Sequence, residues 1–406
     1  MSKLLDRKTF FRSPAPGAAA VGFAANVAIN PARLVSYESR VSRSDTVDHI
    51  LRRLSDDGGL HWGEAETIPC VFKRGDAMER IQQKGVFVDP ATGRCVSLWS
   101  QATLPTNNPL EHMTHCVVRY TVSEDGEATH IVDEQIIHHG DFDSIHHFPG
   151  ITFGKNCLMI GDWGSAPLVR ADGAILVPAQ SSPVGSDGNY HNPTGSYTYT
   201  DALVLIARWR DDKRLSWSCS ARVEGNPARS TRGMIEPTLG ELADGRLLML
   251  MRGSNDCKPE LPGHRWAALS RDGGETWTSP EPWTYHGGEA FHSPSSMSRL
   301  LRHSSGKLLW LGNLCPANPN GNSPRHPIVM GEVDLKDGGL VKSSLLAFDD
   351  RQEGESPHLT LSNFHARENR LDGTIRVYVP RFFAQDWRKD DKIDWTGDTF
   401  EYVLEP

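Results

Sequence analysis

One pattern of polar and apolar positions recurs along the whole chain. Each copy is a short polar turn, usually containing glycine, followed by a run of apolar residues with β-strand character. Such a turn between apolar runs is typical of a β-hairpin, because glycine supplies the positive φ angle that tight turns need. The copies are PARLVSYE from Pro31, ATGRCVSLW from Ala91, ADGAILVPAQ from Ala171, ADGRLLMLMR from Ala243, SSGKLLWLGN from Ser304 and LDGTIRVYVP from Leu371.

The spacing of these turns predicts a repeat architecture. Successive turn positions at 93, 173, 245, 306 and 373 are 80, 72, 61 and 67 residues apart, so six units fill the chain. No long stretch has the helical period, and 37 glycines and 26 prolines interrupt the sequence throughout. Repeated sheets that can bury their faces only against their neighbours favour a propeller over a sandwich. We predict an all-β fold, a single six-bladed β-propeller domain over 1–406, with blades near 20–62, 83–138, 150–222, 232–283, 291–350 and 358–404.

Charge and hydropathy narrow the partners. A net charge of -8 gives no reason to expect nucleic acid or an anionic membrane, since both require a basic surplus. No apolar run approaches the length of a membrane span. The start, MSKLLDRKTFFRSPAPG, has no apolar segment like that of a signal peptide. We therefore expect a cytoplasmic protein, or a secreted one if a leader is missing from the sequence; association into a homo-oligomer stays open.

Two short segments carry a family resemblance. The first is SRDGGETW, in which Ser270, Asp272, Gly274, Thr276 and Trp277 fit the pattern S-x-D-x-G-x-[TS]-W. The second is SDDGGLHW, which matches at Ser55, Asp57, Gly59 and Trp62, and DKRLSW at 212–217 looks like a decayed third copy. These segments resemble the Asp boxes of the sialidase (neuraminidase) superfamily, whose box is a structural turn away from the active site. The resemblance implies a sialidase-type six-bladed propeller.

The same resemblance implies a chemistry. Sialidase-like propellers bind substrate where the inner strands converge, with arginines that clamp a carboxylate, an acid/base Asp, and a Tyr nucleophile activated by Glu. The guanidinium fork suits a carboxylate, and a phenol with a pKa near 10 needs a base beside it. The resemblance places Asp45 as acid/base, with Asp48 as the neighbouring choice, and Glu236 as the residue that polarises the tyrosine. It places Arg252 and Arg325 among the carboxylate-binding arginines.

Two family positions match less closely. The family's first arginine lies in an F/Y-R-I-P motif, for which the nearest text here is Phe11-Arg12-Ser13-Pro14, so Arg12 is the candidate and Arg40 or Arg43 the substitutes. Tyr378, in GTIRVYVPRFF, lies in the sixth unit where the nucleophile is expected. Its alternating strand context equally suits a tyrosine of the core. These departures weaken sialic acid as the substrate more than they weaken glycan chemistry.

Histidine supports a competing mechanism. The chain has 17 histidines, with clusters that include His112 and His115, and His191 in GNYHNPTGSYTYTD beside Tyr190, Tyr197 and Tyr199. Related propellers cleave uronic-acid linkages as lyases or hydrolases, using His or Tyr as base or acid. A metal site is not expected, since no Cys or carboxylate completes a ligand set beside H-x-x-H.

Three hypotheses follow. The first is an exo-acting glycosidase, with no cofactor, that removes a terminal acidic sugar from a glycan or oligosaccharide. The second is a lyase or uronate-linkage glycosidase using His and Tyr, and the third is a non-catalytic glycan-binding propeller. Loop tryptophans that could stack on sugars are Trp99, Trp163, Trp283 and Trp387.

Overall fold

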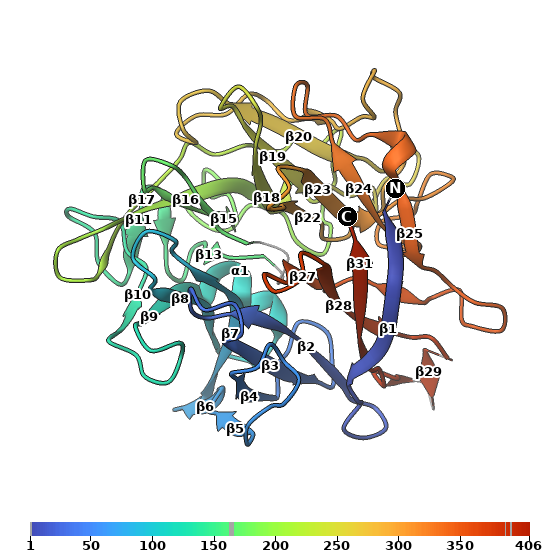
Figure 1. The fold of residues 1–406 in the computed structure, drawn as a ribbon. Helices are drawn as coiled ribbons and strands as arrows, with labels where there is room; N and C mark the ends of the chain where they lie inside the picture. Colours follow the sequence, from blue (N-terminus) through green and yellow to red (C-terminus); the bar gives the residue numbers. More distant parts are fainter. Residues whose placement is uncertain (1, 162–165, 386, 390–391) are drawn as a thin grey trace.

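The protein is a six-bladed β-propeller, as the hairpin repeat predicts (Figure 1). The computed structural model describes residues 2–161, 166–385, 387–389 and 392–406. Six antiparallel sheets surround one axis, and successive sheets along the chain are neighbours in space. Each sheet is built from the hairpins that the turn pattern predicts.

The first three blades follow one another along the chain. Blade 1 contains β2 (Ala19–Asn26), β3 (Leu34–Val41), β4 (His49–Ser55) and β5 (Glu66–Ile68). Blade 2 contains β6 (Val71–Arg74), β7 (Ala77–Val88), β8 (Cys95–Leu104), β9 (Cys116–Ser123) and β10 (Val132–Gln135). Blade 3 contains β13 (Leu158–Met159), β14 (Leu168–Val169), β15 (Ile175–Ser181), β16 (Asp201–Trp209) and β17 (Leu215–Cys219).

The last three blades complete the circle. Blade 4 contains β18 (Ile235–Glu241), β19 (Leu247–Arg252), β20 (Arg265–Ser270) and β21 (Glu281–Pro282). Blade 5 contains β22 (Arg299–Arg302), β23 (Leu308–Asn313), β24 (Ile328–Val333) and β25 (Leu346–Asp349). Blade 6 contains β26 (Thr360–Leu361), β27 (His365–Glu368), β28 (Ile375–Phe382), β31 (Thr399–Glu405) and β1 (Lys3–Phe11).

Short elements decorate the loops. They are the hairpins β11 (His146–Phe148) with β12 (Ile151–Thr152) and β29 (Arg388–Lys389) with β30 (Lys392–Ile393), and the helices η1 (Pro109–Glu111), α1 (His112–His115) and η2 (Lys342–Ser344). Across the described ranges, every helix is too short or too polar to pass through a lipid bilayer.

The two ends of the chain close the propeller. Strand β1 pairs with β31, with Lys3 opposite Glu405 and Phe11 opposite Thr399, so the termini lie side by side (Figure 1). The predicted sixth blade, 358–404, therefore lacked its outermost strand. The sequence pattern concealed this pairing, because β1 reads KLLDRKTFF, has no glycine turn before it, and is mostly exposed.

Apolar runs form the central strands because both faces of each blade are buried. In β19 all six residues are buried, and their side chains alternate between two clusters. Leu247, Met249 and Met251 pack toward blade 3, whereas Leu248 and Leu250 pack toward blade 5. This two-sided burial explains why the run LLMLM has no polar alternation, as sheets covered on both faces lack it.

The segments with the S-x-D pattern form compact turns. In the turn after β20, the Ser270 hydroxyl donates to Asp272 Oδ1 (2.8 Å) and accepts from the Gly274 amide (2.9 Å). Asp272 Oδ1 also accepts from the Thr276 amide (3.0 Å), and Trp277 Nε1 donates to the Gly274 carbonyl (3.1 Å). The turn after β4 repeats the first three bonds with Ser55, Asp57, Gly59 and His61, at 2.9–3.0 Å.

A third turn of this kind follows β9, outside the segments that match the S-x-D pattern. After β9, Ser123 and Asp125 make the same bonds to the amides of Glu127 (2.9 Å) and Thr129 (2.9 Å). Glu127 takes the glycine position with φ 69°, which hid the match. The predicted third copy at 212–217 is instead a plain hairpin, where Asp212 accepts one bond from the Arg214 amide.

Because the Asp272 carboxylate ties three groups of its turn, we expect Asp272→Ala to lower the free energy of unfolding by about 1–2 kcal/mol. Urea denaturation measures the loss, with Asp211→Ala on the exposed β16–β17 hairpin as the matched control. Equal stability of the two variants would contradict a role for the carboxylate in the turn.

Candidate functional site

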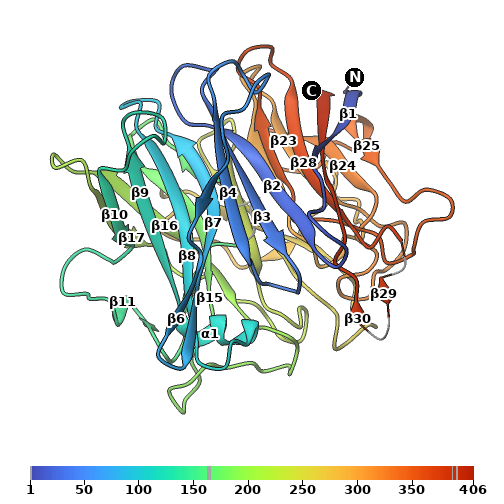
Figure 2. The same ribbon diagram turned by 90° about the horizontal axis from the view of Figure 1, so that it is seen from below.

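A central cavity of about 540 Å³ opens at one end of the propeller, and all six blades contribute to its lining. The β3–β4 loop and α1 lie at this end, whereas the turn after β4 lies at the opposite end of that strand (Figure 2). Its polar lining includes Ser44, Asp45, Lys84, His112, Gln180, Tyr197, Arg232, Glu236, Arg252, Asn322, Arg325 and Asn363. Segments far apart in sequence thus meet at one depression, as inner loops of a propeller do.

Blades 4 and 5 build a wall of arginines around Glu236. Arg252 donates through Nη1 to Glu236 Oε1 (2.7 Å), through Nε to Ser295 Oγ (2.9 Å) and through Nη2 to Asn322 Oδ1 (3.1 Å). Arg325 donates through Nη2 to the Ser295 carbonyl (2.8 Å). Ser295 therefore holds both guanidinium groups at the same place.

A β-bulge directs Glu236 into the cavity. The pairing of β18 with β19 shifts between Ile235 and Thr238, and Ile235 lies opposite Arg252. Such a bulge re-aims a side chain. Glu236 consequently has φ 47°, and its amide donates to Gln180 Oε1 (2.6 Å). Gly161 packs against it, where a Cβ would approach Glu236 Cγ to 2.8 Å.

The charges of the wall act on the ionisation of Glu236. Burial alone would raise the pKa of its carboxyl group, but the guanidinium groups of Arg252, Arg325 and Arg232 hold the pKa below its usual value. Arg232 is itself buried, and this burial together with the neighbouring Arg252 lowers its pKa to about 10. At neutral pH, the wall therefore carries three positive charges and one negative charge.

Across the cavity, Asp45 and Tyr197 form a hydrogen-bonded pair. The Tyr197 hydroxyl donates to Asp45 Oδ2 (3.0 Å), and the Arg232 guanidinium lies 5.7 Å from the centre of the Tyr197 ring. Desolvation by the surrounding protein would raise the pKa of the Asp45 carboxyl group. Hydrogen bonds from Ser44 and Tyr197, together with the charges of His112 and Arg232, hold that pKa below its usual value. Burial raises the pKa of the Tyr197 hydroxyl, and the negative charge of Asp45 raises it further. Asp45 is thus ionised and Tyr197 protonated at neutral pH.

His112 lies in the same part of the cavity as a neutral imidazole. Burial and the charge of Lys84 lower the pKa of His112 to about 4. Its Nε2 atom is buried and has no hydrogen-bond partner. Among the clustered histidines, His112 is the one in the described lining of the cavity, and a neutral imidazole can accept a proton.

Blade 6 supplies an aromatic side of the cavity. Phe382, Phe383, Trp387 and Trp395 line it. Trp387 thus lies where a sugar-stacking residue was expected, and Trp395 was not foreseen. Trp99 and Trp283 are instead core residues, 8% and 4% exposed. Trp163 lies outside the described residues.

Strained backbone gathers at this cavity. Positive φ angles occur at four of its lining residues that are not glycine, namely Asp45 (53°), Glu236 (47°), Asn363 (58°) and Phe383 (59°). Such conformations are costly and persist where surrounding structure holds them, often at functional sites. Their grouping supports this cavity as the working site.

The structure corrects the predicted nucleophile. Tyr378 is fully buried in the core, and its hydroxyl donates to Glu401 (3.0 Å). It alternates along β28 so that its ring faces blade 1 instead of the axis. None of the described blade 6 residues that line the central cavity is a tyrosine.

Two other predicted catalytic residues lie outside the cavity lining. Asp48 accepts bonds from the Ser42 amide (3.1 Å) and hydroxyl (2.6 Å), so its carboxylate closes the β3–β4 loop. His191 is exposed in the 183–191 loop, where its amide donates to the Pro183 carbonyl (2.9 Å). Local turn bonding decides both positions.

The predicted substitutes for a third arginine also lie elsewhere. Arg12 follows the outer strand β1 and is exposed, Arg40 pairs with Glu38 (3.4 Å), and Arg43 donates to the side chain of Asn107 (3.1 Å). The third arginine of the wall is Arg232. It precedes Glu236 by four positions in RGMIE, and this short distance along the chain is the sequence feature that could have identified it as part of the wall.

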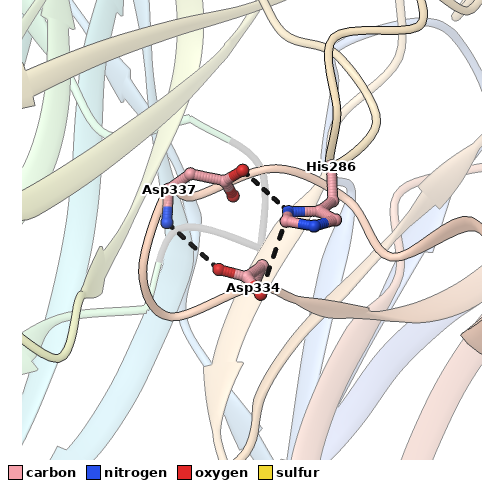
Figure 3. Close-up of side chains that lie close together, drawn as sticks. All are labelled: His286, Asp334 and Asp337. Atoms are coloured by element: carbon pink, nitrogen blue, oxygen red, sulfur yellow. Dashed lines mark hydrogen bonds and ion pairs between the residues drawn. The ribbon is translucent and has the colours of Figure 1, made fainter.

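Within the part of the chain that the structure describes, one group of potential metal ligands lies in the loops after β21 and β24. His286 Nδ1 is 2.7 Å from Asp337 and 3.9 Å from Asp334 (Figure 3). Asp334 Oδ1 already accepts from the amides of Lys336 (2.8 Å) and Asp337 (3.1 Å). These bonds account for the grouping, and we assign no cation to it.

Comparisons with solved structures show the same fold in carbohydrate-active proteins. A protein of unknown function from Dyadobacter fermentans is 15% identical, with TM-score 0.62 over 100% of this chain and 99% of that one. The Hadza microbial sialidase Hz136 is 16% identical, with TM-score 0.59 over 97% of this chain and 65% of the sialidase. An α-L-arabinanase from Penicillium chrysogenum, solved with arabinobiose, is 12% identical, with TM-score 0.56 over 99% and 98%.

Sequence comparisons address the family directly. A search of curated proteins gave no match. The family model described as a BNR repeat-like domain matches residues 49–363, which is more than half of the chain. The chain therefore belongs to the BNR repeat-like family, and its β-propeller fold is similar to that of the sialidase above.

Proposed function

We propose that this protein is an exo-acting glycoside hydrolase that removes a terminal carboxylate-bearing sugar from a glycan. The observation that carries the proposal is the wall where Arg232, Arg252 and Arg325 surround the single carboxylate of Glu236. Its excess of positive charge, inside a protein of net charge -8, suits an anionic ligand. Guanidinium groups recognise carboxylates through paired charge-assisted hydrogen bonds.

Tyr197 and Asp45 form the reactive pair in this proposal. The phenol is protonated, and its proton already points at the ionised Asp45. As the Tyr197 oxygen attacks the anomeric carbon, Asp45 accepts the phenolic proton and passes it to the departing glycosidic oxygen. Water then attacks the anomeric carbon and breaks its bond to the Tyr197 oxygen, while Asp45 accepts a proton from the water and returns it to Tyr197. Arg232 connects the pair to the arginine wall through its contact with the Tyr197 ring.

A lyase on a uronate linkage is the second candidate, and His112 favours it. A neutral imidazole is the form that can remove the proton α to a clamped carboxylate. Tyr197 would then protonate the leaving oxygen. The two mechanisms use the same arginines, so their products distinguish them.

A substrate panel tests the proposal. Purified protein is incubated with sialosides, uronides and uronate-terminated oligosaccharides, and both new reducing ends and ultraviolet absorbance are measured. A hydrolase yields reducing sugar without absorbance, whereas a lyase yields an absorbing unsaturated uronate. Release from neutral glycosides alone would overturn the acidic-sugar proposal, and binding of acidic glycans without turnover would assign the protein as a binder.

The pH dependence follows from the same groups. Asp45 and Glu236 have lowered pKa values, and the pKa of His112 is about 4. All three therefore keep their neutral-pH states as the pH falls to about 5, and kcat/KM should decline only below about pH 4. Arg232, with a pKa of about 10, should set the alkaline decline. A rise of kcat/KM between about pH 7 and 5 would instead indicate an essential protonated acid in the free enzyme.

A further inference from the structure

We propose that a second cavity binds the phosphate or sulfate group of a small organic anion. This inter-blade cavity lies between blades 1 and 6, with a volume of about 570 Å³. Strands β1, β3, β4, β27, β28 and β31 and the turn after β4 supply its walls. None of the described residues lines both this cavity and the central one, so the two sites are separate.

The inter-blade cavity is strongly basic. Its described lining contains five cationic side chains and two carboxylates, an excess of three positive charges in a protein of net charge -8. The cations are Lys8, Arg12, Arg53, Arg367 and Arg376, and the carboxylates are Glu38 and Glu401. Tyr378 belongs both to the cavity lining and to the apolar cluster between blades 1 and 6, so the basic cavity borders that cluster. A basic cavity here calls for an anionic occupant.

The two carboxylates do not neutralise all of these cations. Glu38 pairs with Arg53 (3.3 Å), and Glu401 pairs with Lys8 (3.0 Å). Arg376 pairs with Asp372 outside the lining (3.1 Å). Among the described residues, neither Arg12 nor Arg367 has a carboxylate within the 4.0 Å ion-pair distance. Two guanidinium groups from opposite ends of the chain thus have no carboxylate partner, although Arg367 Nη1 donates to the Glu368 carbonyl (3.5 Å).

Arg367 is the strongest indication of a ligand. Its residue is only 8% exposed, its Nε atom is buried, and that atom has no hydrogen-bond partner. Arg376 also has a buried Nε atom without a hydrogen-bond partner, although its other guanidinium nitrogens pair with Asp372 (3.1 Å) and Glu401 (4.0 Å). Burying a donor without an acceptor is costly, and a buried charge more so. An oxyanion supplies several acceptors and the opposite charge at once, in a geometry that the guanidinium fork fits.

The size of the cavity points to an ester instead of a free ion. A volume of about 570 Å³ lies within the range of about 300–1,000 Å³ typical of small-molecule sites. The partly buried rings of Phe10 and Trp62 add aromatic surface to the lining. A phosphate or sulfate group bound to the arginines, with a sugar-sized ring against these aromatic side chains, would occupy both the basic and the aromatic part of the cavity.

Isothermal titration calorimetry tests the proposal with glucose 6-phosphate, glucose 6-sulfate and unmodified glucose as probes. We expect one or both esters to bind, with an affinity that falls as salt rises, and glucose not to bind. The tighter ester identifies the preferred group. Arg367→Gln should weaken binding about ten-fold or more, since it removes a charge-assisted contact. Arg12→Glu, an exposed change that spares the core, should weaken it similarly.

Two controls locate the binding. Arg271→Glu changes an exposed arginine on the turn after β20 and should leave the affinity unchanged. Arg252→Ala, in the central cavity, should also leave it unchanged, which separates this proposal from the enzymatic one. Failure of folded wild-type protein to bind either ester would overturn the proposal. So would loss of binding in Arg252→Ala with retention in Arg12→Glu and Arg367→Gln.

Discussion

Arg252→Ala is expected to lower kcat/KM on a carboxylate-bearing glycan by about 100-fold or more. The side chain joins Glu236, Ser295 and Asn322, so its removal deletes one ligand contact and releases the other groups of the wall. Breaking a buried ion pair costs about 3–5 kcal/mol because the partner charge is left uncompensated. That loss is read as the ratio of kcat/KM values between wild type and variant.

Arg271→Ala is the matched control, because it removes an exposed arginine from the same blade. Its kcat/KM should equal that of the wild type. Thermal unfolding of both variants separates lost binding from lost folding. A folded Arg252→Ala variant with unchanged kcat/KM on the acidic substrate would remove the arginine wall from the mechanism.

Tyr197→Phe is expected to lower kcat by about 1,000-fold with little change in KM. The substitution keeps the ring that lies beneath Arg232 and deletes the hydroxyl that bonds Asp45. Loss of a nucleophile or proton donor acts on the chemical step, for which effects of about 100- to 10,000-fold are usual. Steady-state kinetics on the best substrate of the panel supplies both constants.

Tyr190→Phe is the control from the same loop. Its hydroxyl accepts the Tyr199 amide (2.7 Å) outside the described lining of the central cavity, so its loss should cost about 1 kcal/mol of stability and leave kcat unchanged. If Tyr197→Phe and Tyr190→Phe have the same kcat, the Tyr197–Asp45 pair is not the reactive pair. Another group, with His112 first, would then carry the proton transfer.

Part of the candidate site could be predicted from the sequence. Asp45, Glu236, Arg252 and Arg325 were placed by local motifs, and all four line one cavity. Motifs succeed there because these residues lie at strand ends or in the adjoining loops, and the strand pattern is readable. Tyr378 failed because it lies in the middle of β28, where side chains pack against a neighbouring blade, whereas Phe382 at the end of that strand lines the cavity.

Neighbouring carboxylates show a second limit. Asp45 and Asp48 share one loop, yet Asp45 faces the cavity and Asp48 is held by Ser42. Which of the two carboxylates faces the cavity depends on the positive φ angle at Asp45 and on the hydrogen bonds from Ser42 to Asp48. Such details depend on the packing around the loop, which residue type alone does not indicate.

The sequence by itself determined the repeat, the all-β class and the turns that join the strands, because hydrophobic periodicity and turn chemistry act between residues close together in the chain. Only the tertiary structure decided the closure of β1 on β31, the place of Arg232 beside Arg252, the pairing of Tyr197 with Asp45 and the basic cavity between blades 1 and 6. Each of these joins segments from different blades or opposite ends of the chain. Their contacts depend on how the blades pack around the axis, and no local pattern encodes that packing.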